Sequence, residues 1–440
     1  MAKKVIKQFF KFPSLEPKAI NANEIYALSQ NSDIDKANEI LRRQSRSISV
    51  STSLTSGFFE TLSSEVLGQN GIILDVNTTD KALNSKIENA FFEWENGCSL
   101  NECDDFEDIE EQILKAFYRD GEAFIRLIKK DNLKIEVLDA DKIPSDYNDD
   151  KKNIKSGILR DEKTLKPLFY FYTLEEKGFK KTLAKIPASD IIHIKKELVR
   201  GQSRGISKFA GSIIDINSKD NFKKAELDRA RLNSEITGFI IDKDAGGFGD
   251  ENEEIELPQS ATTGKMNYIG ADMDVQFSPS HNDTNIEYYL KSTDREIAKS
   301  LGMSYENYTG DLSGVNFSSI RQGTLSERRN YKRIQRFLTR KFHNKIFLAW
   351  LKIELLNNKI NIAQYKQITA NFTFKAQSWE YVDPIKEVNA SRIAIESGFK
   401  TRCEVLREKG IELDTFLEEL EKDKKIMQKL KELEDLRGDK

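Results

Sequence analysis

Hydrophobic side chains recur at every fourth position through a basic stretch in the last third of the chain. The recurring residues are Ile334, Leu338, Phe342, Ile346 and Trp350. Because residues four apart lie close to one face of an α-helix, this spacing predicts one long helix over residues 318–356. An element of this length favours a helix-dominated fold over a turn-rich, all-β one.

The other faces of this predicted helix carry an excess of positive charge. Residues 319–352 include ten lysines and arginines but one acid, Glu327. Such a surface could follow a phosphate backbone without reading bases. It could also pair with acids of a neighbouring subunit or stay solvated, which is the more common role of charged helix faces. The candidate DNA or inter-subunit face consists of Arg321, Arg328, Arg329, Lys332, Arg333, Arg336 and Arg340.

Composition supports the helical interpretation and excludes several classes of protein. The 440 residues include 23 glycines and 8 prolines, few enough for long uninterrupted helices. With 38% hydrophobic and 32% charged residues, we expect two or three packed units and no membrane span. The net charge of −3 indicates neither a generally basic DNA-binding protein nor an acidic tail. Cys98, Cys103 and Cys403 are too few and too scattered for a disulfide framework, so we expect free thiols.

The rest of the chain predicts an α+β fold dominated by helices. Helical patterns cover residues 33–67, as two helices, and residues 82–95, 106–119, 206–237 and 285–301. Short β-rich runs lie between residues 123 and 195. Near the end of the chain, Asp383 and Pro384 begin one predicted helix, and a capping box of Thr401 and Glu404 begins the next.

Residues 239–283 form an acidic segment between two predicted helices. The segment contains ten acidic residues but only two basic ones, Lys243 and Lys265, and it is rich in glycine. Loops and short strands are therefore expected, with a surface suited to basic protein partners and unsuited to DNA. Its candidate docking residues are Asp250, Glu251, Glu253, Glu254 and Glu256.

One motif raises the possibility of an enzyme. Residues 201–205 match G-x-S-x-G, with Ser203 at the nucleophile position between a predicted strand and a predicted helix. A hydrolase of this type needs a histidine after the serine, and His281 and His343 lie in unsuitable surroundings. A tight polar turn is therefore the preferred interpretation. His193 is expected to be a structural histidine of its strand. The sequence predicts no catalytic residue, no metal site and no cofactor.

Several motifs occur in an order that resembles one protein family. Residues 201–207, 295–305, 310–321 and 379–387 are the strongest, supported by residues 186–193 and the region of Trp94, Cys98 and Phe106. Together they resemble the lambda-type portal proteins of tailed phages and prophages, over residues 35–415. Phe317 stands where the family usually has tyrosine, and the arginine-rich stretch at Arg42, Arg43 and Arg46 is short.

The resemblance implies a ring, usually a dodecamer, at one vertex of the virion capsid. Double-stranded DNA would pass through it during packaging and ejection, without sequence specificity. Implied partners are the terminase large subunit, the scaffold and major capsid proteins, and head-completion or adaptor proteins, with assembly in the host cytoplasm and no membrane contact. The implied regions are an N-terminal and wing region (1–205), a first stem helix (206–238), an acidic clip (239–283), a second stem helix (284–302), a tunnel loop (303–317), the remaining wing with the long helix (318–382), and a helical crown with a tail (383–440).

The tunnel loop is the candidate channel segment. Base-specific contacts worth about 1–3 kcal/mol each would trap a sliding duplex, so small polar residues suit a channel wall. A surface loop that closes a helical hairpin is the alternative. The candidate channel residues are Ser304, Asn307, Tyr308, Thr309, Ser313, Asn316 and Ser318.

Overall fold

The computed structural model divides into two compact units. Unit 1 comprises residues 1–210 and 300–440, and unit 2 comprises residues 211–299. The structure describes residues 31–177, 180–235, 239–242, 273–276, 286–314, 316–379 and 384–408, together with short helical pieces between 416 and 429. None of the described helices combines the length and the hydrophobicity that a membrane span requires.

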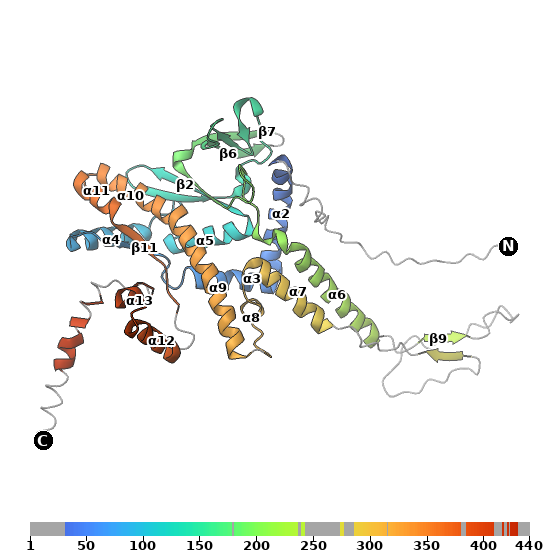
Figure 1. Cartoon of the computed structure of the whole chain (residues 1–440). Coiled ribbons are helices and arrows are strands. Elements are labelled where there is room, and N and C mark those ends of the chain that lie inside the picture. Colours follow the sequence, from blue (N-terminus) through green and yellow to red (C-terminus); the bar gives the residue numbers. More distant parts are fainter. Residues whose placement is uncertain are drawn as a thin grey trace, which may run out of the picture. The chain divides into compact units, whose positions relative to one another are not determined.

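Unit 1 begins with four helices, all predicted from the sequence and shown in blue to cyan in Figure 1. They are α2 (Asn31–Ser51), α3 (Ser53–Val66), α4 (Lys81–Glu95) and α5 (Phe106–Arg119). The Asp80 carboxylate caps α4, and Asp105 and Asp108 form a capping box at the start of α5. The apolar face of α3 is buried, where the ring of Phe58 packs against those of Tyr118 and Phe209.

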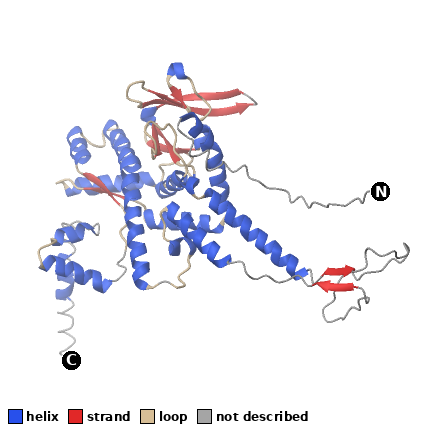
Figure 2. Cartoon of the chain, turned by 45° about the vertical axis from the view of Figure 1, so that its right-hand side comes forward, coloured by secondary structure: helices blue, strands red, loops and turns tan. Residues whose placement is uncertain are grey.

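Three small antiparallel sheets complete unit 1, drawn as red arrows in Figure 2. The first pairs β1 (Ile73–Val76) with β11 (Phe372–Lys375), far apart in the sequence. In the second, β2 (Glu122–Lys129) lies between β3 (Leu133–Leu138) and β8 (Ile191–Lys195). The third has the order β4 (Ile154–Lys155), β5 (Ile158–Arg160), β6 (Pro167–Lys177) and β7 (Lys180–Pro187).

The predicted long helix is present but contains an irregular turn. It consists of α9 (Phe317–Leu338), a π-helical turn over Thr339–His343 and α10 (Asn344–Leu356). In a regular helix every four-residue step rotates a further 40° or so, and an apolar stripe of this period would drift off one face. A π turn takes up an extra residue and corrects the drift. All five residues of the predicted stripe are buried.

The stripe packs into an aromatic core built from distant parts of the chain. The Phe91 ring of α4 lies 5.5 Å from that of Phe347 and 5.1 Å from that of Trp350 on α10. It also contacts Phe106 of α5 and Phe374 of β11. Ring pairs of this kind add to the stability gained from burial alone, and they fix the long helix to the N-terminal helices.

Unit 2 is built on a pair of helices joined through a two-stranded sheet. They are α6 (Ile213–Glu235) and α7 (Ile286–Leu301), whose last two residues belong to unit 1. The rings of Phe222 and Tyr289 lie 4.6 Å apart, and Lys219 pairs with Asp294. The strands β9 (Phe239–Asp242) and β10 (Met273–Gln276) pair antiparallel. They confirm the short strands expected in the acidic segment, whose candidate docking residues lie outside the described residues.

Two predicted boundaries are wrong. Residues 206–212 are not part of α6, because a 3₁₀ turn over Lys208–Gly211 precedes it and the Ser207 hydroxyl accepts a hydrogen bond from the Phe209 amide. The polar loop 303–317 is not wholly loop, because it contains the short helix α8 (Tyr305–Thr309). Sequence patterns also missed β7, a strand rich in lysine at the end of its sheet.

The C-terminal helices begin where the sequence placed them. Helix α12 spans Pro384–Glu396, with Pro384 at its first position and Gly398 in the left-handed region just beyond it. Helix α13 spans Arg402–Glu408, and Thr401 and Glu404 exchange the two hydrogen bonds of the predicted capping box. Asp383, the predicted cap of α12, lies outside the described residues.

Candidate functional site

The candidate channel segment is an ordered turn held against α9. The Ser304 hydroxyl caps α8 by accepting a hydrogen bond from the Asn307 amide, and Gly310 ends the helix with φ of +72°. Glycine takes this left-handed conformation without steric cost. After it, the Asp311 carboxylate accepts hydrogen bonds from the Tyr305 hydroxyl and the Ser313 amide.

Glu327 anchors this turn. Its carboxylate accepts hydrogen bonds from the Ser304 amide (3.2 Å), the Ser304 hydroxyl (3.1 Å), the Asn307 side-chain amide (2.6 Å) and the Tyr331 hydroxyl (2.7 Å). Burial raises the pKa of Glu327, although these hydrogen bonds oppose the rise. The one acid of the basic helix therefore has a structural role, holding α8 to α9.

Removing this anchor should open the turn without unfolding the chain. We expect Glu327→Ala to leave several donors of the turn unpaired, at a cost of about 1–3 kcal/mol. Hydrogen exchange of the amides in residues 304–309 should accelerate accordingly. Ser326→Ala, at the exposed neighbouring position, is the matched control and should leave that exchange unchanged. Equal exchange rates in the two variants would contradict the anchoring role.

The seven candidate channel residues do not all share one surface. Asn307, Ser313 and Asn316 are exposed, and Ser304 and Thr309 are half-buried. Tyr308 is buried, with 4% of its surface exposed, so it is a core residue of the folded subunit rather than part of a channel wall. Ser318 belongs to α9, and its side chain lies outside the described residues. The exposed part of the turn is thus small and polar.

The residues of the candidate basic face differ in their surroundings. Arg328 and Lys332 lie over the ring of Trp379, with 5.8 Å and 5.9 Å from their charged groups to its centre. Such cation–π contacts fix the segment after β11 on α9. Arg321 is half-buried. The exposed remainder, at the four- and three-residue spacing of a single helix face, is Arg329, Arg333, Arg336 and Arg340.

The exposed stripe continues onto a neighbouring segment. Burial lowers the pKa of Lys208, and the positive charges of Lys196 and Arg333 lower it further. Like charges therefore gather here. Among the residues that the structure describes, Arg333, Arg336 and Arg340 form no ion pair with any acid.

Ser203 does not have the surroundings of a nucleophile. It is buried, with 1% of its surface exposed, and its hydroxyl has no hydrogen-bond partner within the described residues. Both ring nitrogens of His193 bond elsewhere, Nε2 to Glu122 at 3.0 Å and Nδ1 to the Tyr170 hydroxyl at 3.4 Å. Within the described part of the chain, no general base therefore contacts Ser203. The observed geometry is that of a tight polar turn and a structural histidine, as the sequence indicated.

The neighbouring residue Arg204 belongs to a buried charge network that sequence reasoning missed. Glu122 is completely buried and pairs with Arg204 at 2.8 Å and with Arg42 of α2 at 3.1 Å. It also accepts hydrogen bonds from the Gly205 amide and from His193. Burial by itself raises the pKa of Glu122, but Arg204, His193 and Arg42 together lower it well below its usual range.

A second, more exposed network extends the first along α2. Arg46 donates to both oxygens of Asp120 at 2.9 Å and pairs with Asp139 and Asp141 at 2.8 Å. The hydrogen bond to Asp120 is the main reason that the pKa of Arg46 is raised. The only sequence signal was Arg42 and Arg46 at i, i+4 spacing, which places both on one face of α2. Arg43 points elsewhere and pairs with Glu39.

No cluster of three or more metal-binding side chains occurs within the described ranges. Cys98, Cys103 and Cys403 are free thiols, as predicted. Burial raises the pKa of the Cys98 thiol to about 12, so it is not a reactive thiolate.

Comparisons with known proteins agree with the motifs. A model of the lambda family of phage portal proteins matches residues 20–335. A probable portal protein of Halomonas phage phiHAP-1 is 24% identical over 422 residues, covering 89% of this chain and 81% of that protein. The fold is similar to a chain from the neck of a native GTA particle computed with C12 symmetry (TM-score 0.52, 15% identity, 84% of this chain and 94% of that chain). A chain from the neck of an empty GTA particle computed with C6 symmetry gives a TM-score of 0.51 at 14% identity, over 83% of this chain and 93% of that one.

The family model covers well over half of the chain, and the helix-dominated α+β fold agrees with it. The chain therefore belongs to the lambda family of phage portal proteins.

Proposed function

We propose that this chain assembles into a closed ring at one vertex of a phage or prophage capsid and that double-stranded DNA passes through the ring. The observation that carries the proposal is the family match over residues 20–335, together with a fold similar to that of a particle-neck chain computed with C12 symmetry. Twelve subunits are the expected number. The chain itself would supply structure, and a separate motor would supply the energy for DNA movement.

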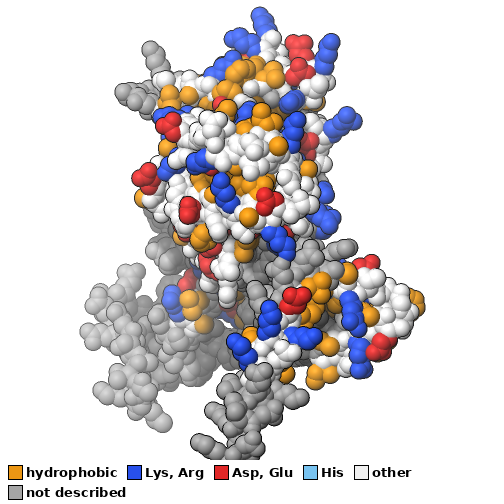
Figure 3. All heavy atoms as spheres, turned by 90° about the vertical axis from the view of Figure 1, so that its left-hand side faces the viewer, with side chains coloured by type: hydrophobic (Ala, Val, Ile, Leu, Met, Phe, Trp, Pro, Cys, Tyr) orange, Lys and Arg blue, Asp and Glu red, His pale blue; other side chains and the backbone are white. Residues whose placement is uncertain are grey.

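Exposed hydrophobic side chains support assembly. Figure 3 shows hydrophobic side chains at the surface among charged ones on one face of the molecule. In unit 2, Leu227 is 51% exposed and Tyr288 is 69% exposed, and in α12 Ile385 is 75% exposed. Head-to-tail contacts in a ring would cover such surfaces on every subunit at once, because the same pair of complementary patches repeats around the axis.

The proposed regions follow the described elements. Helices α6 and α7 would form the stem, residues 239–283 the clip, and residues 383–440 the crown with its tail. The acidic clip would bind basic surfaces of the terminase large subunit during packaging and of adaptor proteins afterwards. Contacts with scaffold and major capsid proteins would fall on the wing. The exposed polar residues Asn307, Ser313 and Asn316 would border the channel, where weak contacts let a duplex slide.

The exposed arginine stripe is proposed to contact the neighbouring subunit rather than DNA. The described chain offers exposed acids at the start of α5, namely the N-cap residue Asp105 and, on the first turn, Glu107 and Asp108. A head-to-tail contact brings different faces of two subunits together, so a basic stripe can meet an acidic one.

Neutralising the stripe should therefore weaken the ring. We expect the triple variant Arg333→Gln, Arg336→Gln and Arg340→Gln to lower the ring fraction at moderate salt and to reduce its salt dependence. The matched control is Lys151→Gln, Lys152→Gln and Lys155→Gln, which removes three charges from another surface. Mass photometry across a salt series measures both. Unchanged rings combined with weaker DNA binding would assign the stripe to DNA instead.

Mass photometry of the unaltered protein tests the proposed function. As concentration rises, a discrete species of about twelve subunits should replace the monomer. A sample that stays monomeric at high concentration, or one that forms only open chains of variable length, would contradict the proposal.

A further inference from the structure

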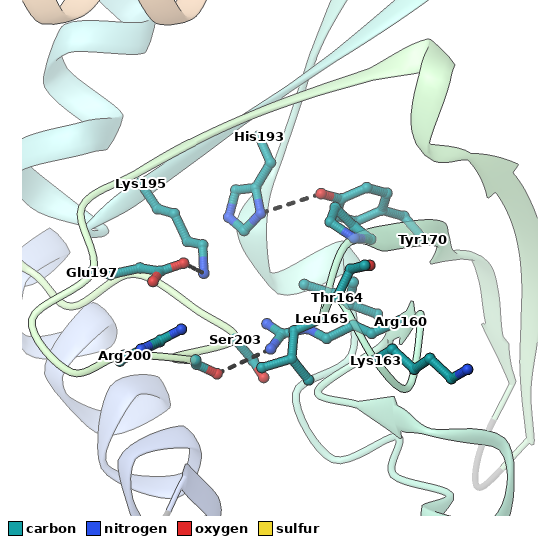
Figure 4. A pocket seen from close by; sticks show the side chains of 13 residues that line it. Arg160, Lys163, Thr164, Leu165, Tyr170, His193, Lys195, Glu197, Arg200 and Ser203 are labelled. Carbon is teal, nitrogen blue, oxygen red and sulfur yellow. Dashed lines mark hydrogen bonds and ion pairs between the residues drawn. The ribbon is translucent and has the colours of Figure 1, made fainter.

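A pocket of about 290 Å³ lies in unit 1 between the β5–β6 turn, strand β8 and the loop that leads to Ser203. Figure 4 shows side chains reaching it from these different elements. The pocket is not part of the proposed channel, clip or subunit contact. It contains the G-x-S-x-G serine for which the portal function has no use.

The lining is dominated by positive charge. Arg160, Lys163, Lys195 and Arg200 line the pocket, and Glu197 is the one acid among the lining residues. His193 adds no charge at neutral pH, because burial lowers its pKa to about 4 despite the hydrogen bond to Glu122. Four cations and one carboxylate leave an excess of three positive charges, which favours an anion.

Two of these cations are held in place by backbone carbonyls. Arg160 is buried and donates to the carbonyl oxygens of Gly201 at 3.0 Å and Gln202 at 3.3 Å. Lys195 donates to the carbonyl oxygen of Gln202 and pairs with Glu197 at 3.2 Å. Burial lowers the pKa of Lys195, and the nearby charge of Arg160 lowers it further, although Glu197 opposes the shift. An additional negative charge would stabilise both side chains.

A second, independent observation is that the Ser203 hydroxyl lacks a hydrogen-bond acceptor. Ser203 lines this pocket, and its buried hydroxyl has no hydrogen-bond partner within the described residues. A buried hydroxyl without a hydrogen bond is unfavourable. A bound oxyanion would accept a hydrogen bond from this hydroxyl. Since no base contacts Ser203, the geometry suits binding rather than covalent chemistry.

We propose that this pocket binds a phosphate group, either free inorganic phosphate or the phosphate of a small monoester. The Ser203 hydroxyl would donate to a phosphate oxygen, Arg160 and Lys195 would supply fixed positive charge, and Lys163 and Arg200 would close the open side. The dianionic charge of phosphate matches the excess of three positive charges better than a single carboxylate does.

Titration calorimetry of the full-length protein with inorganic phosphate, at low salt in a buffer free of oxyanions, tests this proposal. Binding of one phosphate per chain is expected. Ser203→Ala should weaken it about tenfold, as for loss of one hydrogen bond to a charged group. Lys163→Gln should weaken it about threefold or more. Lys166→Gln is the matched control, because Lys166 is exposed in the same turn and does not line the pocket.

Adenosine monophosphate as a second probe distinguishes the two sources. Tighter binding of the monoester assigns the pocket to a small phosphorylated molecule, whereas binding of inorganic phosphate alone assigns it to the free ion. Absence of binding with both probes would overturn the proposal. So would equal losses in Lys163→Gln and Lys166→Gln with Ser203→Ala unaffected, because that pattern indicates diffuse surface attraction. The pocket lies within one unit, so the test does not depend on ring formation.

Discussion

Replacing Glu122 by alanine is expected to destabilise unit 1 by about 3–5 kcal/mol, because it leaves the buried Arg204 without a counter-charge and Arg42 with Asp141 alone. Arg204 and Arg42 are 0% and 2% exposed in their side chains, so water cannot replace the lost carboxylate. The ion pairs of these two arginines with Glu122 connect α2, β2 and the loop before Gly205. Denaturant unfolding followed by circular dichroism measures the loss, and fewer rings should form at a given concentration.

Glu136→Ala is the matched control for this variant. Glu136 lies on β3 of the same sheet and pairs with Arg126 at 3.4 Å, with both side chains partly exposed. Partly exposed pairs contribute about 0.2–1 kcal/mol, so this change should be small. If the free energy of unfolding of Glu122→Ala lies within about 1 kcal/mol of that of the unaltered protein, the two arginines have found other partners.

The same carboxylate makes stability depend on pH. The pKa of Glu122 is lower in the folded state than in the unfolded chain, where it is about 4.3. Its contribution is therefore present above about pH 4.3 and is lost as the pH falls through the folded-state pKa. Glu122→Gln should flatten the acid side of the stability curve.

Gly205→Ala is expected to be the second severe change and to lower the free energy of unfolding by about 3 kcal/mol. A Cβ atom at Gly205 would lie 2.1 Å from the Gly121 carbonyl oxygen, and one at Gly121 would lie 2.2 Å from the Ile206 carbonyl carbon. Neither neighbour is a side chain that can rotate away. This close approach of two backbones lets the Glu122 carboxylate accept from the Gly205 amide at 2.9 Å.

Gly57→Ala tests whether the effect comes from the close approach. Gly57 lies in α3, and a Cβ atom there meets nothing within 4 Å. Alanine is favoured over glycine inside a helix, so the free energy of unfolding of this variant should rise by about 0.5–1 kcal/mol. Thermal unfolding of the two variants should thus shift in opposite directions. A Gly205→Ala protein as stable as the unaltered one would show that the loop of residues 201–206 can shift away from β2 without loss of stability.

Much of the fold could be predicted because long periodic helices leave a strong signal. The stripe from Ile334 to Trp350 and the capping box at Thr401 rest on local spacing alone. The π turn at 339–343 was not predicted, because a strict four-residue period implies a drift but does not say where along the helix the extra residue is taken up. Strand β7 was not predicted, because its lysines resemble a charged turn and its strand conformation comes from pairing with β6.

The candidate site was predicted less completely, because burial depends on contacts between distant residues. Nothing local distinguishes Tyr308 from the other polar loop residues, yet it lies in the core. Glu327 stood out as the one acid of a basic helix, and the structure gives it two partners 20 or more residues away in sequence, Ser304 and Asn307, besides Tyr331 on its own helix. Glu122 had no signal of its own, since its arginines come from α2 and from the loop before Gly205.

Electron microscopy of the purified protein shows whether the chain forms a ring with a channel wide enough for a DNA duplex. If the chain is a wedge of a closed ring around DNA, end-on views will show a central hole wide enough for a duplex. A reconstruction would then place the exposed residues Asn307, Ser313 and Asn316 at the edge of that hole. Solid particles without a hole, or a ring with this turn on its outer wall, would contradict the account.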